Sequence, residues 1–498
     1  MEQRSPASGI DAARLVLLFA AFAGTASNTF AQGGRPPAVA GKFYPGEMDD
    51  LRKTVNELLA QAAPVKLPGK TVAMLVPHAG YVYSGQTAAR AYKALKGKWD
   101  TFVIIGAGHR YAVKGAAVYA EGSFRTPLGN VLVNRELCMK LFNESPLIFG
   151  SARAHRGEHS IEVQLPFLQT MSRDSTIVPM VMNLLDMKTC KEVGEAIGRA
   201  LKDENALVLI SSDLSHYPAR DVASVVDRTT LLSMEFMSPS YFRATSRSMR
   251  SRRIPELSCT YCGEAATIAG MFAANALGAD RVVPIEYLNS GQLKHGDPNR
   301  VVGYASVAFV RTGKDGRRRR PRITADEKAM LRKVARESIV NQLNGKPSTA
   351  PLYKNPELNL PAAVFVTLKK GGRLRGCIGS TVPKLPLVHA VMYSARQAAF
   401  NDHRFKKLQK EELAGLELEI SVLSPLRKVS SADEIVPGKH GVAVSLGKKS
   451  GLFLPQVWGS LTDKELFLSE LCSQKAQLPR NAWKDGRTNL MVFTVEKF

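Results

Sequence analysis

The sequence predicts two domains of different classes: an α/β domain with a central sheet flanked by helices, followed by an α+β domain. Three observations support this. Apolar, β-branched runs alternate with helical patterns over residues 37–312. A strongly basic segment interrupts that pattern at 313–323. Residues 325–498 then contain runs of alternating apolar and polar residues, which are typical of strands in a mainly antiparallel sheet.

The elements of the first domain are expected to alternate along the chain. Strands that helices cover on both faces read as continuous apolar runs, so no polar alternation is needed to recognise them. The expected strands are 72–76, 101–105, 177–182 and 206–210. The expected helices are 49–62, 86–95, 160–168 and 188–201.

The second domain is expected to begin with a helix. Thr324-Ala-Asp-Glu327 resembles a capping box, which predicts a helix that ends near Leu343. Proline-rich spacers follow at 347–361. The further expected strands are 362–368, 416–424, 442–446 and 489–495, and the further expected helices are 385–400 and 462–476.

The N-terminus has the pattern of a signal peptide over residues 1–31. Arg4 and Arg14 precede an apolar stretch at 15–24, and small and polar residues follow up to Ala31. A transmembrane helix needs about 20 apolar residues, more than this stretch offers. We therefore expect a periplasmic or secreted mature protein without a transmembrane segment; an uncleaved anchor and a cytoplasmic protein are the alternatives.

The composition is that of a globular protein with excess positive charge. The 498 residues are 45% hydrophobic and 22% charged, which excludes a disordered or fibrous chain. The formal net charge is +24, and residues 313–498, with 33 Lys and Arg against 17 Asp and Glu, contribute +16 of it. The excess of positive charge alone does not show whether the protein binds nucleic acid, binds an anionic surface or is simply made soluble by its charge.

Two basic segments carry much of this charge. Residues 313–322 have a net charge of +5, and because like charges repel and stay solvated we expect a linker at 313–323. Residues 243–253 hold five Arg and no acidic residue. We expect a solvated loop there; a loop that binds an anion or docks a partner is the alternative.

Histidines follow the expected strands at their carboxyl ends, where α/β proteins place their chemistry. His78, His109 and His216 each lie shortly after such a strand, and His159 lies in the segment Glu158-His-Ser-Ile-Glu162. Two imidazoles with a thiolate or carboxylate can form a three-ligand metal site with open positions. A structural loop histidine is the alternative for any one of them, but three in the same context favour a site.

Six motifs carry a family resemblance. In chain order they are AVAGKFYP at 38–45, PHAGYVYSG at 77–85, GAGH at 106–109, EHSIEVQLP at 158–166, SSDLSH at 211–216 and Cys262-Gly263. Together they resemble the Memo family, whose fold is similar to that of class III extradiol dioxygenases. The resemblance implies a metal site formed by His78, His109 and Cys262, with Asp213, His216 and His159 as the neighbouring catalytic candidates.

The third ligand implied by this resemblance is Cys262, where the dioxygenases have a carboxylate. The resemblance implies iron, whereas a soft thiolate shifts metal preference towards copper or zinc, so we expect iron or copper, with zinc as a third candidate. His216 could act as a general acid and base or as a fourth ligand, and Asp213 could orient it or take a proton. We expect Cys259 to be an incidental neighbour of Cys262; the alternative, a disulfide between the two, would remove the thiolate ligand and place metal binding under redox control.

The second domain resembles the AMMECR family over 325–498. The motifs are GRLRGCIG at 372–379, NDHRF at 401–405, LELEISVLSP at 416–425, GLFLPQV at 451–457, KAQL at 475–478 and Trp483. Gly376 and Gly379 permit a backbone path that a Cβ would obstruct. Arg375 could bind an anion and Cys377 could be a nucleophile or ligand; a structural turn with a buried cysteine and a surface arginine is the alternative.

A chain in which a Memo-like region is followed by an AMMECR-like region resembles components of the AmmeMemoRadiSam system. This resemblance implies a radical SAM protein as a partner. This chain has no Cys-x3-Cys-x2-Cys motif, so it is not the radical enzyme. The leading hypothesis is a non-haem, metal-dependent oxidoreductase that acts on an unknown small-molecule or peptide substrate. The alternative is a non-catalytic metal-binding or peptide-binding scaffold. No nucleic-acid-binding motif is evident, so no specific nucleic-acid partner is expected, and nucleic-acid binding through the basic second domain is the least favoured alternative.

Overall fold

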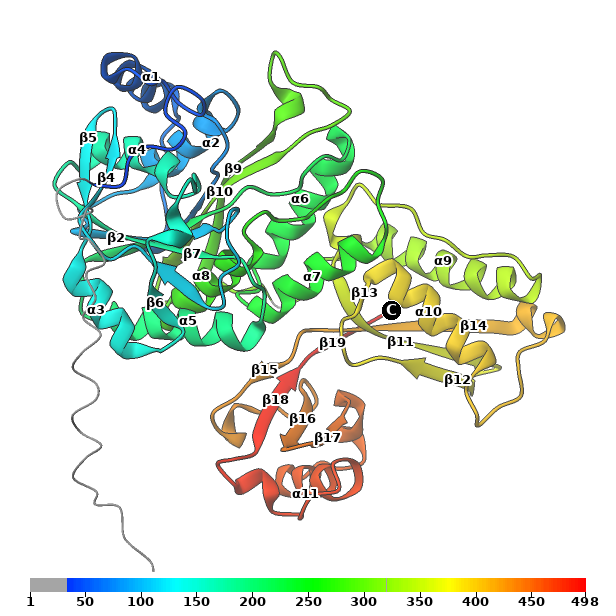
Figure 1. Cartoon of the computed structure of the whole chain (residues 1–498). Helices are drawn as coiled ribbons and strands as arrows, with labels where there is room; N and C mark the ends of the chain where they lie inside the picture. Colours follow the sequence, from blue (N-terminus) through cyan, green and yellow to red (C-terminus); the bar gives the residue numbers. More distant parts are fainter. Residues whose placement is uncertain (1–33, 319) are drawn as a thin grey trace, which may run out of the picture.

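A computed structural model describes residues 34–318 and 320–498 of the chain (Figure 1). The expected signal peptide at 1–31 lies outside the described residues. Within the part that is described, no helix combines the length and the apolar character that a membrane crossing requires.

The first domain is built on an eight-stranded mixed sheet. The four expected strands are present and form its parallel centre, which continues in antiparallel fashion through β10 and β9 on one side. In spatial order the strands are β6 (Ile148–Gly150), β3 (Ala116–Val118), β7 (Thr176–Met182), β2 (Thr101–Ala107), β8 (Ala206–Ser211), β1 (Lys70–Val76), β10 (Gly303–Arg311) and β9 (Arg281–Asn289). A separate hairpin consists of β4 (Ser123–Thr126) and β5 (Gly129–Leu132).

Helices cover both faces of this sheet (Figure 1), which confirms the predicted α/β class. Alternate residues of β2 show why its sequence is continuously apolar: Val103 and Ile105 pack into one core, and Phe102 and Ile104 into the other. One core includes residues of α3 (Arg135–Glu144), α5 (Met187–Ala200), α6 (Arg220–Met234), α7 (Pro239–Ser251) and α8 (Glu264–Ala276). The other includes residues of α1 (Met48–Gln61), α2 (Tyr81–Ala94) and α4 (Leu165–Met171).

The second domain contains two antiparallel sheets, each with its own core, and its α+β class is confirmed (Figure 1). The first sheet has the order β12 (Arg373–Gly379), β11 (Pro361–Lys370), β14 (Leu416–Leu423) and β19 (Val495–Lys497), and β13 (Leu385–Pro386) also pairs with β11. The helices α9 (Ala325–Leu343) and α10 (Leu387–Phe400) contribute to its core. The second has the order β15 (Arg427–Lys428), β18 (Asn489–Phe493), β16 (Gly441–Leu446) and β17 (Lys449–Phe453), with α11 (Lys464–Glu470) beside it.

The start of α9 has the expected capping box. The Thr324 hydroxyl accepts from the backbone N–H of Glu327, and the Glu327 carboxylate accepts from the backbone N–H of Thr324. These reciprocal bonds satisfy two donors that a helix N-terminus otherwise leaves without an intrahelical partner.

The loop expected at 243–253 is wrong: most of this segment belongs to α7. Ser238 caps the helix by accepting from the backbone N–H of Tyr241 at 3.3 Å. Phe242, Thr245 and Met249 are buried on one face while arginines occupy the other. Apolar residues at helical spacing therefore outweigh the density of positive charge.

The basic linker is also less solvated than its charge predicts. Arg318 has only 8% of its side chain exposed and bridges the two domains. Its Nε lies 3.1 Å from Glu235 at the end of α6, and its Nη1 lies 2.7 Å from Glu357 of the second domain. Two carboxylates thus compensate a charge that the sequence alone would leave in water.

Candidate metal centre

The carboxyl ends of β1, β8 and β2 open into one cavity of about 580 Å³. Because the three strands are parallel neighbours, the loops that follow them meet at the same edge of the sheet. The predicted site residues that line this cavity are His78, His109, His159, Asp213, His216 and Cys262.

Three of these residues bring ligand atoms together. The nearest ligand atoms of His78, His109 and Cys262 all lie within 4.8 Å of one another. His109 Nε2 is 2.9 Å from Cys262 Sγ, and the rings of His78 and His109 meet edge to face with centroids 5.2 Å apart. Two imidazole nitrogens and one sulfur at this spacing can bind a single metal ion.

The hydroxyl of Ser211 determines which nitrogen of the His78 ring carries the proton. Ser211 Oγ donates its one proton to the Ser160 carbonyl and accepts from Gln164 Nε2 at 3.0 Å. It also lies 3.2 Å from His78 Nδ1, so Nδ1 must carry the proton that this contact needs. Nε2 then presents a lone pair, and it is buried with no hydrogen-bond partner among the described residues. A metal ion would satisfy this atom.

Glu158 holds His109 in the same tautomer. His109 Nδ1 donates to Glu158 Oε1 at 2.9 Å, which leaves Nε2 facing Cys262. The carboxylate also accepts from the backbone N–H groups of His109, His159 and Ser160. His109, Glu158 and His159 form a second possible ligand group. With four donors already bound, however, Glu158 is better suited to orient His109 than to bind metal itself.

Burial sets the protonation of the site. It lowers the pKa of His78 to about 3 and that of His159 to about 4, so both imidazoles are neutral near pH 7. Burial raises the pKa of the Cys262 thiol, so a metal ion would displace its proton on binding. Although burial opposes the ionisation of Glu158, hydrogen bonds from His109 hold the pKa of its carboxyl well below the usual range.

Asp213 and His216 face the same cavity outside the three-ligand group. Asp213 Oδ1 accepts from the backbone N–H of His78 at 2.8 Å, and Oδ2 lies 3.9 Å from His78 Nε2. His216 Nε2 is buried without a hydrogen-bond partner among the described residues. Burial raises the pKa of Asp213 and lowers that of His216, so burial favours the uncharged form of both groups. Each group is therefore a candidate to exchange a proton with a molecule in the cavity.

The loop after β8 is held by its neighbours. The backbone N–H of His216 donates to the Cys259 carbonyl, and that of Cys262 donates to the Asp213 carbonyl, both at 3.2 Å. These two bonds join the segment that carries the thiol to the segment that carries the acid–base pair. Cys259 and Cys262 are both free thiols.

Asp227, on α6, also holds the loop that follows β8. It is fully buried and accepts from the backbone N–H of Ser215 at 3.0 Å and from the Tyr287 hydroxyl at 2.9 Å. Burial raises the pKa of Asp227 to about 7. This carboxyl therefore links the position of Ser215, next to His216, to α6 and β9.

Arg375 and Cys377 lie on β12 of the second domain and do not line the metal cavity. The alternative of a structural turn around them is wrong, since Arg373–Gly379 form the strand β12. The guanidinium of Arg375 donates to both carboxylate oxygens of Glu412, at 2.8 and 3.0 Å. Cys377 donates its backbone N–H to Asp402 at 2.8 Å, and its sulfur accepts from the Thr367 hydroxyl at 3.3 Å.

Sequence reasoning missed the residues that orient the histidines. Glu158 precedes His159 in a recognised motif, and Ser211 opens the segment that carries Asp213, but neither was assigned a role. The signal that was available is that polar residues at strand ends are buried only when they have partners. Asp227 gave no such signal because it lies within an amphipathic helix.

Comparison with known proteins gives two matches along the chain. Residues 35–308 match the Memo-like protein family, and residues 332–498 match AMMECR1. A MEMO1 family protein from Aquifex aeolicus is 36% identical over 279 residues, which is 55% of this chain and 99% of the relative. One from Methanopyrus kandleri is 35% identical over 56% of this chain and 99% of the relative.

Solved structures are similar over parts of the chain. An uncharacterised protein from Pyrococcus horikoshii is 37% identical over 35% of this chain and 92% of its own, with a TM-score of 0.33. One from Escherichia coli K12 is 12% identical over 48% of this chain and 100% of its own, with a TM-score of 0.35. On the family matches, the chain belongs to the Memo family and carries an AMMECR1 domain after its Memo region.

Proposed function

We propose that the Memo region binds one metal ion: iron or copper, both of which are redox-active, with redox-inactive zinc as a third candidate. The proposed ligands are His78, His109 and Cys262. The observation that carries the proposal is the convergence of these three ligand atoms within 4.8 Å. The tautomers that Ser211 and Glu158 impose support it, because they aim both histidine Nε2 lone pairs at the cavity.

We propose further that this site performs metal-dependent redox chemistry on a small molecule. The metal, when bound, would supply Lewis acidity and electron transfer, and a thiolate ligand favours metals softer than those of all-oxygen sites. His216 Nε2 would give or take the proton of the substrate, and Asp213 would exchange protons with it. His159 stacks on His109 with ring centroids 4.5 Å apart and would confine the substrate beside the ligands.

The test is metal analysis of the purified protein. We expect close to one equivalent of iron or copper in the wild type, and at least a tenfold lower content in His78→Ala and in Cys262→Ser. His295→Ala, at an exposed histidine outside the cavity, and Cys377→Ser, in the second domain, are the matched controls and should retain the metal. Metal content that does not change in the His78 and Cys262 variants would refute the proposal.

A second candidate function is a non-catalytic module that binds metal or a peptide. It is favoured by the mouth of the cavity, where Val82 and Tyr83 are 81% and 46% exposed and offer an apolar contact surface. His216→Gln separates the two functions. An enzyme should keep its metal and lose turnover of catechol-like or dicarbonyl substrates with O2, whereas a scaffold should show no O2 consumption in either form.

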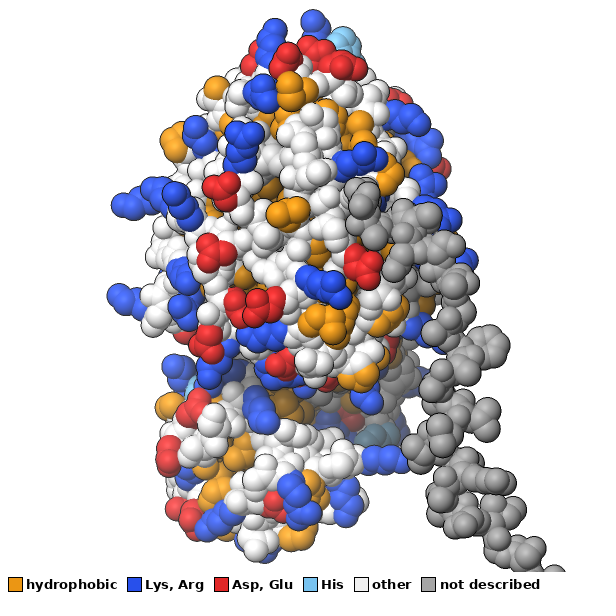
Figure 2. Space-filling view, turned by 60° about the vertical axis from the view of Figure 1, so that its left-hand side comes forward, with side chains coloured by type: hydrophobic (Ala, Val, Ile, Leu, Met, Phe, Trp, Pro, Cys, Tyr) orange, Lys and Arg blue, Asp and Glu red, His pale blue; other side chains and the backbone are white. Residues whose placement is uncertain are grey.

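The resemblance to the AmmeMemoRadiSam system supports a radical SAM protein as a partner in this chemistry, and co-purification of the two proteins tests that. We propose no specific nucleic-acid partner. On the face drawn in Figure 2, the Lys and Arg side chains of the described residues lie among Asp and Glu side chains and form no continuous patch. Export of the mature protein stays a prediction from residues 1–31.

A further inference from the structure

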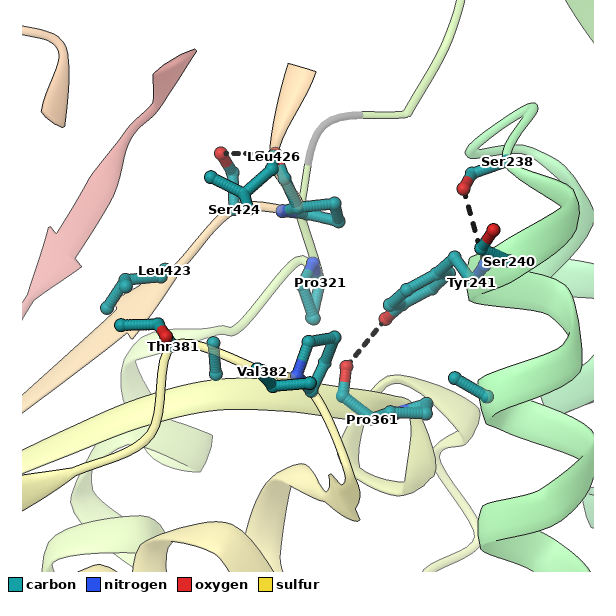
Figure 3. A pocket seen from close by; sticks show the side chains of 14 residues that line it. Ser238, Ser240, Tyr241, Pro321, Pro361, Thr381, Val382, Leu423, Ser424 and Leu426 are labelled. Atoms are coloured by element: carbon teal, nitrogen blue, oxygen red, sulfur yellow. Dashed lines mark hydrogen bonds between the residues drawn. The ribbon is translucent and has the colours of Figure 1, made fainter. Parts of the chain in front are cut away.

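A second cavity, of about 270 Å³, lies where the two domains meet (Figure 3). The first turns of α7 form one wall, and the facing ends of β11 and β14 form the opposite wall. Pro321 of the linker lies between them. The lining residues used below are Ser240, Tyr241, Ala244, Pro361, Ala363, Thr381, Val382 and Leu426.

Small and rigid residues keep this cavity open. Ser240 and Ala244 on α7 and Pro361 and Ala363 on β11 line the cavity with short or rigid side chains, which leave space between the walls. The Tyr241 hydroxyl donates to the Pro361 carbonyl at 2.7 Å and joins the two walls at one end (Figure 3). Because proline rings fix their own backbone, the cavity is formed before any ligand enters.

The chemistry of the lining restricts the ligand. No charged side chain lines the cavity among the described residues, so a charged ligand would lose its hydration without gaining a counter-ion. The Ser240 and Thr381 hydroxyls make no hydrogen bond within the described residues and are available to donate one. Val382 and Leu426 are 51% and 45% exposed, which makes the lining apolar where it reaches the surface.

We propose that this junction cavity is a binding site for a small uncharged molecule with an apolar ring and one hydrogen-bond acceptor. Its ring would pack against the prolines and Tyr241, and its acceptor would face Ser240 or Thr381. The volume of about 270 Å³ lies near the lower end of the range for small-molecule sites. The site belongs to both domains and does not depend on the proposed metal chemistry.

The test uses the full-length protein and two ligands of similar size in ligand-observed NMR titrations. Acetophenone is uncharged and carries a carbonyl acceptor, whereas benzoate carries a negative charge. We expect saturable binding of acetophenone and at least tenfold weaker binding of benzoate. The double variant Ser240→Ala/Thr381→Val should weaken acetophenone binding about fivefold.

Ala244→Trp fills the cavity and should weaken acetophenone binding at least tenfold. Val82→Trp places the same side chain at the mouth of the metal cavity and should leave binding unchanged. If Ala244→Trp does not fold, Val382→Arg replaces it as the variant that should weaken acetophenone binding. Val382 lines the cavity and is exposed, so the substitution should not prevent folding. The proposal is overturned if no saturable binding occurs, if benzoate binds as well as acetophenone, if Val82→Trp abolishes binding, or if the folded Ala244→Trp and Val382→Arg proteins bind like the wild type.

Discussion

At the scale of single residues, the candidate metal centre depends on groups that would not touch the metal. Glu158 accepts four hydrogen bonds and orients His109, and Ser211 sets the tautomer of His78. Carboxylates that orient metal-binding histidines raise ligand basicity and fix the ring. The properties of the site should therefore respond to changes one contact away from the ligands.

Glu158→Gln tests this. A glutamine amide has the volume of the carboxylate, but its NH2 group cannot accept from the backbone N–H groups around it. We expect affinity for Cu(I) and for Fe(II) to fall by about 10- to 100-fold, measured anaerobically by competition with a chromophoric chelator. Glu136→Gln, at an exposed glutamate, is the control. Unchanged affinity in Glu158→Gln would show that the carboxylate does not tune the site.

Asp227 gives a pH prediction. Its pKa is raised by burial to about 7, whereas an aspartate in an unfolded chain titrates near 4. The folded protein therefore binds a proton more tightly than the unfolded chain. The stability contributed by that proton is fully present below about pH 4 and is lost as the pH rises through about 7.

The non-titrating variant Asp227→Asn isolates this effect. Between pH 4 and pH 8 the free energy of unfolding of the wild type should fall relative to that of Asp227→Asn, by at most about 4 kcal/mol. Urea denaturation at four pH values measures the difference. Parallel pH profiles for the two proteins would contradict the raised pKa.

At the scale of elements, the AMMECR motif is explained by a close approach between a strand and a helix. A Cβ on Gly376 of β12 would collide with the backbone carbonyl oxygen of Ala398 on α10. The Asp402 carboxylate and the Arg404 guanidinium bind the backbone N–H and carbonyl of Cys377. The motif therefore has a structural role whether or not Cys377 also reacts.

Gly376→Ala should destabilise the protein by about 1–3 kcal/mol, because the added methyl group forces the strand and the helix apart. Gly415→Ala is the matched control, since no atom lies within 4 Å of the position of its added Cβ. Chemical denaturation of both variants measures the effect. Equal stabilities would mean that β12 can shift without cost.

At the scale of the whole molecule, the linker joins the domains more firmly than its sequence indicates. Arg318 lies between Glu235 and Glu357, and its backbone N–H also donates to the Glu235 carbonyl at 2.8 Å. Arg252, just after α7, reaches the Ala350 carbonyl of the second domain at 3.3 Å. These contacts and the Tyr241–Pro361 bond keep the junction cavity in place.

Arg318→Ala should lower the free energy of unfolding by about 2–3 kcal/mol, because it leaves the partly buried carboxylates of Glu235 and Glu357 without their cation. Arg322→Ala removes an exposed arginine of the same linker and should cost less than about 0.5 kcal/mol. Denaturant titration compares the two. Limited proteolysis of the linker should accelerate only in Arg318→Ala.

The parts of the fold that could be predicted are those whose signal is local. The strands of the parallel centre are covered on both faces, so each is a continuous apolar run, and the α9 capping box lies within four residues. β9 and β10 could not be predicted in this way, because β9 is mostly half-exposed and β10 contains small residues that need a neighbouring strand. The five arginines at 243–253 favoured a solvated loop, although most of this segment belongs to the helix α7.

The sequence by itself determined the two fold classes, the family and the histidines and cysteine that line the candidate metal centre, because hydrophobic periodicity and strand-end motifs depend only on neighbours along the chain. Only the tertiary structure decided the tautomers of His78 and His109, the pairing of Arg318 and the presence of a cavity between the domains. The physical reason is the same in each case. A hydrogen-bond partner, a compensating charge or a facing wall comes from a distant segment, and folding alone brings it near.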